Sequence, residues 1–145
     1  MSKINIQGTI DNIKSRSNVY SPLVEAVVNS IEAIDETTNK NKGKIIISVI
    51  RDNVLKFDGI LSEIIGFEIQ DNGVGFTQIH RDSFDTFYSD TKKNIGGKGF
   101  GRFMYIKYFN EVKIESVFKD GKVFKLRKFS FGKDYDIIKD ETIEE

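Results

Sequence analysis

Apolar residues recur at helical spacing near the amino-terminal end of the chain. They follow Ser21 and Pro22, two residue types that are favoured at the start of a helix. The recurring positions are Leu23, Val24, Val27, Val28, Ile31 and Ile34. This pattern predicts a helix from about residue 22 to residue 36.

Two later apolar runs predict strands. Ile45 to Ile50 is nearly all β-branched, which is typical of a buried strand. Ile64 to Gln70 predicts a second strand, which leads directly into Asp71. Between the two runs, Asp58-Gly59 is typical of a turn.

Two short helices are predicted further along the chain. They cover Thr77 to Phe84 and the aromatic-rich stretch Phe100 to Tyr108. The segment Asp85 to Lys98 has no clear period and predicts a loop. We interpret the aromatic residues of the second helix as core, and a partner surface is the alternative.

A hairpin is predicted in the last third of the chain. Val112 to Phe118 and Lys122 to Phe131 flank Asp120-Gly121, a dipeptide that favours a tight hairpin turn. The charged end, residues 134–145, predicts frayed chain or the start of a missing carboxyl-terminal region. We therefore expect one domain over residues 1–133.

The composition excludes several classes of site. The 145 residues contain no cysteine and a single histidine, His80, so cysteine chemistry and multi-histidine metal sites are excluded. Basic and acidic residues number 22 each, so no global charge favours nucleic acid or an anionic membrane. No apolar run approaches the roughly 20 residues of a membrane helix, and we expect a cytoplasmic protein.

The first predicted helix carries an acidic stripe. At 100° per residue, Glu25, Asn29, Glu32 and Glu36 fall within about 60° of arc. Acids at this spacing repel one another, so a nearby cation is expected. Oxygen ligands of this kind suit Mg²⁺, which is often shared with substrate phosphates. A solvated acidic face is the alternative interpretation.

Glycines follow the second predicted strand and precede the aromatic helix. Asp71, Gly73 and Gly75 would offer a fixed acceptor and a backbone that a flat ligand can approach. Further along, oriented N–H groups of a glycine cluster would suit an anion. Its glycines and basic neighbours are Lys92, Lys93, Gly96, Gly97, Lys98, Gly99, Gly101 and Arg102. Ordinary surface turns are the alternative for both, and the Walker A pattern is missing.

Together, the three motifs resemble the ATP-binding domain of the GHKL superfamily, which includes gyrase, the ninety-kilodalton heat-shock chaperones, histidine kinases and MutL-type repair proteins. They are Glu25-Ala26-Val27-Val28-Asn29-Ser30-Ile31-Glu32-Ala33, Asp71-Asn72-Gly73-Val74-Gly75, and Gly97-Lys98-Gly99-Phe100-Gly101. The resemblance covers roughly residues 20 to 131. It implies a Bergerat fold, an α/β two-layer sandwich whose mixed, mostly antiparallel sheet has helices on one face.

The resemblance also implies roles for single residues. Glu25 would be the general base, Asn29 the Mg²⁺ ligand, and Asp71 the carboxylate that recognises the adenine amino group. The resemblance also implies an ATP lid at about residues 85–101. The remaining residues in contact with the nucleotide, some of them in this lid, would be Glu32, Ala33, Gly73, Gly75, Phe76, Gly97, Lys98, Gly99, Phe100 and Gly101. Ser130 is the candidate for a hydroxyl contact from a late strand.

The implied function is Mg²⁺-dependent ATP hydrolysis, with ATP or ADP in a site whose lid gates self-association or a partner. A histidine-kinase catalytic domain and a nucleotide-binding interaction module are the alternatives. Glu25 favours hydrolysis, because kinase domains usually lack this glutamate. His80 lies in a polar context and is expected to face solvent. We expect an ATP-dependent homodimer, no membrane contact, and DNA association only through other regions.

Overall fold

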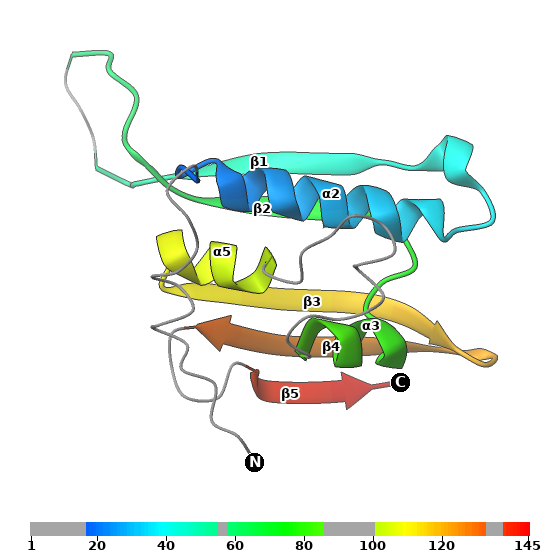
Figure 1. Cartoon of the computed structure of the whole chain (residues 1–145). Coiled ribbons are helices and arrows are strands. Elements are labelled where there is room, and N and C mark those ends of the chain that lie inside the picture. Colours follow the sequence, from blue (N-terminus) through cyan, green and yellow to red (C-terminus); the bar gives the residue numbers. More distant parts are fainter. Residues whose placement is uncertain (1–16, 55–57, 86–100, 133–137) are drawn as a thin grey trace. The chain divides into compact units, whose positions relative to one another are not determined.

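A computed structural model describes residues 17–54, 58–85, 101–132 and 138–145 (Figure 1). The chain divides into two compact units. The smaller unit is Ala26–Gly73, and the larger unit combines Met1–Glu25 with Val74–Glu145. Helix α2 (Ser21–Asp35) contributes its first turn to the larger unit and its remainder to the smaller one. The predicted helix is confirmed to within one residue at each end.

The smaller unit contains an antiparallel strand pair. Strand β1 (Ile45–Arg51) pairs with β2 (Ile64–Asp71), and Ile45 lies opposite Asp71. A one-turn helix, η1 (Lys40–Lys42), connects α2 to β1. Both strands are confirmed, and Gly59 has the positive φ of 71° that its turn requires.

The expected burial of β1 is wrong. Its large apolar side chains keep between 40% and 48% of their surface exposed, and they are Ile46, Ile47, Val49 and Ile50. The β-branched run fixed the strand conformation correctly. Burial depends on which layers cover the strand, and among the described strands β1 pairs only with β2.

The larger unit contains a three-stranded antiparallel sheet. Its strands are β3 (Glu111–Asp120), β4 (Val123–Gly132) and β5 (Lys139–Glu144), in the order β3-β4-β5. Asp120 lies opposite Val123, so Gly121 and Lys122 form a two-residue loop. Gly121 has a φ of 61°, as a primed hairpin turn requires. The predicted hairpin is confirmed.

Strand β5 corrects the expectation that the charged end is frayed. Lys139 to Glu144 pairs with β4, because the edge of β4 offers a row of backbone partners that no side-chain pattern reveals. Residues 134–137 lie outside the described part of the chain. The domain limits given above stay a prediction.

Two helices cover the same face of this sheet. Helix α3 (Gln78–Asp85) contributes Phe84, and helix α5 (Gly101–Tyr108) contributes Phe103 and Ile106, to one core with Phe129 and Phe131. The rings of Phe84 and Phe131 meet edge to face at 5.1 Å between centroids. Such pairs add roughly 0.5–1.5 kcal/mol beyond their burial. Phe103 and Tyr105 of α5 therefore form part of the core, as expected, whereas Tyr108 lies outside this cluster and hydrogen-bonds to Ser17.

The α/β sandwich class is confirmed. The described strands form two sheets, β1-β2 and β3-β4-β5. Within each sheet, neighbouring strands are antiparallel. None of the helices in the described residues has both the length and the apolar character needed to cross a membrane.

Candidate functional site

Helix α2 carries the predicted polar stripe. Glu25, Asn29 and Glu32 are all partly buried, whereas Glu36 lies beyond the last helical residue and is exposed. The stripe therefore consists of two carboxylates and one amide at one-turn spacing. All three offer hard oxygen donors of the kind that Mg²⁺ accepts.

Asp71 lies at the end of β2 and its carboxylate is fixed in orientation. The Ser30 hydroxyl donates to Asp71 Oδ2 at 2.8 Å, and the Gly73 N–H donates to Asp71 Oδ1 at 2.9 Å. Each oxygen accepts one of these bonds and has a second lone pair. The residue is exposed, so the carboxylate is oriented and can still accept from an external N–H donor.

Gly73 lets the end of β2 approach α2 closely. A Cβ at this position would lie 2.6 Å from both the Cβ and the carbonyl carbon of Ala33. Two predicted site residues therefore meet at a contact that only glycine permits. The intervening Asn72 has a structural role, since its side chain accepts from the Lys44 N–H at 2.7 Å and donates to the Lys42 carbonyl at 2.8 Å.

Gly75 belongs to the larger unit and is constrained differently. Its φ is 75°, and an added Cβ would overlap the carbonyl oxygen of Val117 on β3. The next N–H, of Phe76, donates to the Ser116 hydroxyl at 2.7 Å. The Phe76 ring lies in the aromatic core, 5.5 Å from Phe129 between centroids. The Gly75 turn is thus held against the edge of β3.

The expectation that His80 faces solvent is wrong. Its Nδ1 lies 3.1 Å from the Gly75 carbonyl oxygen and 3.2 Å from the Thr77 hydroxyl, and the side chain is partly buried. The physical reason is the position of α3, which begins directly after the turn. Its first helical turn brings residue 80 back over Gly75.

Glu25 lines a hollow of about 270 Å³ in the larger unit. Its walls come from the start of α2 and from Met104 of α5, and the lining residues are Asn18, Tyr20, Ser21, Val24, Glu25 and Met104. Lys107 and Tyr108 of α5 reinforce this contact through hydrogen bonds of 2.8 Å to Ser17. Glu25, the first residue of the first motif, therefore lies beside Met104 of α5, the helix that begins at Gly101.

The rest of the predicted lid cannot be placed. Gly97, Lys98, Gly99 and Phe100 lie outside the described residues, as does the predicted loop apart from Asp85, which is the last residue of α3. In the part of the chain that the structure describes, no three His, Asp or Glu side chains gather as a metal cluster. Ser130 is buried on β4.

Sequence reasoning missed Ser30 and Ser116. Each is a polar residue at an inward position of an apolar pattern. Ser30 is only 4% exposed on the apolar side of α2, and Ser116 lies between Ile114 and Phe118 on the inward face of β3. A hydroxyl at such a position needs a partner, which is a signal that the sequence contains.

Comparison with known families gives a match over most of the chain. Residues 16–130 match the family described as histidine kinase-, DNA gyrase B-, and HSP90-like ATPase. This range contains all three motifs. No curated protein and no solved structure matches the chain.

Proposed function

Because the chain belongs to the family of histidine kinase-, DNA gyrase B- and HSP90-like ATPases, we propose that it hydrolyses ATP in a magnesium-dependent reaction. Membership of this family makes the chain an ATP-binding domain. The observation that carries the proposal is the oriented carboxylate of Asp71 beside the helix that bears Asn29 and Glu25.

Adenine recognition is assigned to Asp71. The amino group of adenine is an N–H donor, and a carboxylate offers only acceptors. Ser30 and Gly73 hold this carboxylate in one orientation before the nucleotide arrives, which reduces the cost of ordering it. The glycines at positions 73 and 75 hold the chain that follows Asp71, because Ala33 and Val117 take the space that a Cβ would need at Gly73 and Gly75, respectively.

Asn29 and Glu25 are assigned to the phosphate end. Bound Mg²⁺ would neutralise phosphate charge, and the amide oxygen of Asn29 fits it as a single protein ligand. Glu25 lies one turn earlier on α2 and lines a hollow that could admit water. It would orient that water and accept its proton. Gly97, Lys98, Gly99 and Gly101 would supply backbone N–H groups and charge to the phosphates as a lid.

Two variants separate binding from turnover. Asp71→Asn replaces an acceptor by an N–H donor, and we expect ATP affinity in calorimetric titration to fall at least about tenfold. Asp35→Asn, an exposed acid on the same helix–strand unit, is the matched control. Glu25→Ala is expected to bind ATP and lose nearly all turnover. Unchanged turnover would remove Glu25 from the mechanism.

A nucleotide-gated association is the second candidate function. Val24, Val28 and Ile31 form a row along α2 with 61%, 43% and 48% of their surfaces exposed, which favours contact with another protein surface. We propose that ATP promotes a homodimer or binding of a partner. Light scattering with a non-hydrolysable ATP analogue tests the dimer, and a monomer at all concentrations argues against it.

The histidine-kinase alternative makes a separate prediction. A kinase domain would transfer the γ-phosphate of labelled ATP to a histidine of another domain, whereas the Glu25 mechanism releases inorganic phosphate. Phosphate release without labelled protein supports hydrolysis.

A further inference from the structure

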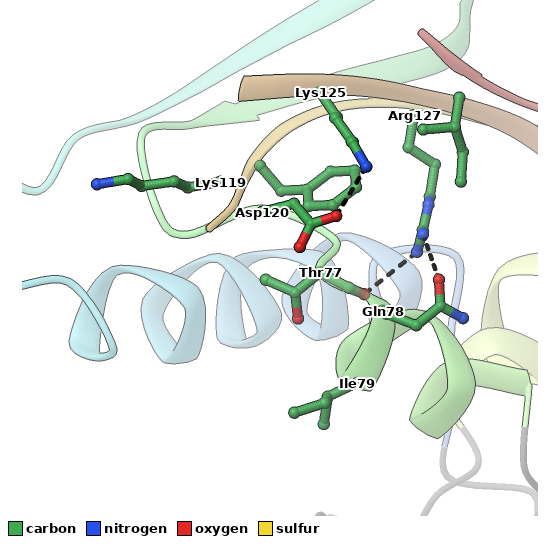
Figure 2. A pocket seen from close by; sticks show the side chains of 9 residues that line it. Thr77, Gln78, Ile79, Lys119, Asp120, Lys125 and Arg127 are labelled. Carbon is green, nitrogen blue, oxygen red and sulfur yellow. Dashed lines mark hydrogen bonds and ion pairs between the residues drawn. The ribbon is translucent and has the colours of Figure 1, made fainter. Parts of the chain in front are cut away.

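Buried Arg127 holds the start of helix α3. Only 1% of its surface is exposed, and its guanidinium donates to the Thr77 carbonyl at 3.2 Å and to Gln78 Oε1 at 2.7 Å (Figure 2). Beside these bonds lies a hollow of about 310 Å³, lined in part by Ile79 and Phe118. Because this space is open, apolar packing alone does not fix the first residues of α3, and the two hydrogen bonds do.

A single carboxylate from β5 faces two guanidinium groups. Glu141 accepts from Arg81 of α3, with Nε 3.1 Å from both carboxylate oxygens and Nη2 2.8 Å from Oε2. Its Oε1 also lies 3.5 Å from Arg127 Nε. That Nε is buried and makes no hydrogen bond to any described residue. Glu141 thus compensates the positive charge of Arg81 on α3 and that of Arg127, which binds the first residues of α3.

A β-bulge aims Glu141 at these partners. The pairing of β4 with β5 passes from Lys128 opposite Thr142 to Ser130 opposite Lys139, so Asp140 and Glu141 face the single residue Phe129. Asp140 has a φ of 55°, in the left-handed region that side chains other than glycine disfavour, although aspartate tolerates it better than most. Such strain persists where surrounding contacts outweigh it, and the carboxylate–guanidinium bonds are contacts of that strength.

Helix α3 is in turn connected to the turn that contains Gly75. His80 of α3 lies 3.1 Å from the Gly75 carbonyl oxygen, and only Phe76 and Thr77 separate Gly75 from the helix. Movement of α3 would therefore shift a turn that is assigned to the nucleotide.

We propose that Arg127 and Glu141 are positioning residues for the nucleotide, through which strand β5 holds α3 and the Gly75 turn in the binding arrangement. This inference rests on the proposed ATP site. By reciprocity, bound ATP stabilises the contact between β5 and α3. We name the Arg81, Arg127 and Glu141 cluster the β5 latch.

The first test needs no nucleotide. Hydrogen exchange of residues 74–85 is compared in the wild type, in Glu141→Gln, and in Glu144→Gln as an exposed control on the same strand. We expect amide exchange in this segment to accelerate about fourfold in Glu141→Gln, the effect of losing about 0.8 kcal/mol of local stability, and to stay unchanged in the control. Equal exchange in all three proteins would overturn the latch.

A charge swap guards against a general folding defect. Arg81→Glu alone is expected to loosen α3, and the pair Arg81→Glu with Glu141→Arg is expected to restore part of the protection, because the exchanged pair can re-form while the new guanidinium at position 141 also meets Arg127. Additive loosening in the double variant would show that the two residues do not act as a pair.

The second test measures nucleotide binding. The latch predicts that ATP affinity weakens several-fold in Glu141→Gln while turnover at saturating ATP is kept, because Glu25 is untouched. Unchanged affinity together with faster exchange in α3 overturns the positioning role and leaves the ATP site standing. Failure of the wild type to bind ATP overturns the proposed function instead.

Discussion

The two glycines at positions 73 and 75 are separated by one residue but are required for different physical reasons. Gly73 has nothing unusual in its backbone and is needed because the end of β2 approaches Ala33 of α2. Gly75 has a φ of 75° and lies against the Val117 carbonyl of β3. The first serves the smaller unit and the second serves the larger one.

The hydroxyl groups near the two glycines show the same division. Ser30 fixes a side chain, the carboxylate of Asp71, which is available to a ligand. Ser116 fixes the backbone, the N–H of Phe76, whose ring is committed to the core. This short motif therefore contains Asp71, whose carboxylate is available to a ligand, and Gly75, whose backbone conformation sets the turn. Substitutions at the two positions should affect ligand binding and the turn separately.

The largest effect is expected from Gly75→Ala. The left-handed backbone costs about 1–2 kcal/mol for alanine, and overlap with Val117 adds to it, so we expect about 3 kcal/mol of destabilisation in urea unfolding. Gly121→Ala is the matched control, because Gly121 has a φ of 61° and no atom within 4 Å of an added Cβ. Equal losses in the two variants would show that the contact with β3 contributes nothing.

Gly73→Ala is expected to cost about 2 kcal/mol through overlap with Ala33 alone. Hydrogen exchange should localise the loss to α2 and β2, whereas Gly75→Ala should loosen the segment beside β3. If both variants loosen the same segment, the division between the two glycines is wrong.

Ser30→Ala should have a smaller effect on stability and a clearer effect on binding. Water can replace the hydroxyl at the exposed carboxylate of Asp71, so we expect about 1 kcal/mol of lost stability at most. The carboxylate loses its fixed orientation, and ATP affinity should fall about fivefold in calorimetric titration. Ser48→Ala, an exposed position on β1, should leave affinity unchanged.

Acid below pH 4.5 should loosen α3 in the larger unit. Hydrogen bonds from Arg81 lower the pKa of Glu141 below its ordinary value of 4.5, partly opposed by burial and aided by the charges of Arg81 and Arg127. The unfolded chain therefore binds this proton more readily. The contribution of Glu141 to stability is complete above pH 4.5 and is lost as the pH falls below that value.

The size of this effect should be under about 1 kcal/mol, because the ion pair is partly solvated. Unfolding of the wild type and of Glu141→Gln is compared from pH 7 down to the acid range. The difference between the two proteins should shrink at acid pH. A constant difference would mean that Glu141 acts through packing and not through its charge.

Local patterns predicted the regular elements well. The 3.6-residue period of α2, the β-branched runs of β1 and β2, and the turn chemistry at Gly121 are properties of neighbouring residues, so the chain determines them without distant contacts. The order of the three motifs likewise identified the family that matches residues 16–130.

Other features depended on residues far apart in the chain. The sequence marks Ser30 and Ser116 only as polar residues at inward positions, and the fold supplies their partners 41 and 40 residues away. The pairing of β5 with β4 and the cluster of Arg81, Arg127 and Glu141 also join distant segments.

The sequence by itself determined where helices, strands and turns form and which chemical groups a nucleotide could use. Only the tertiary structure decided which of these groups are fixed in orientation, and which distant residues fix them. Helix and strand periodicity follows from the backbone geometry of adjacent residues. Hydrogen bonds such as that of Ser30 with Asp71, and close approaches such as that of Gly73 to Ala33, exist only once separate elements have packed.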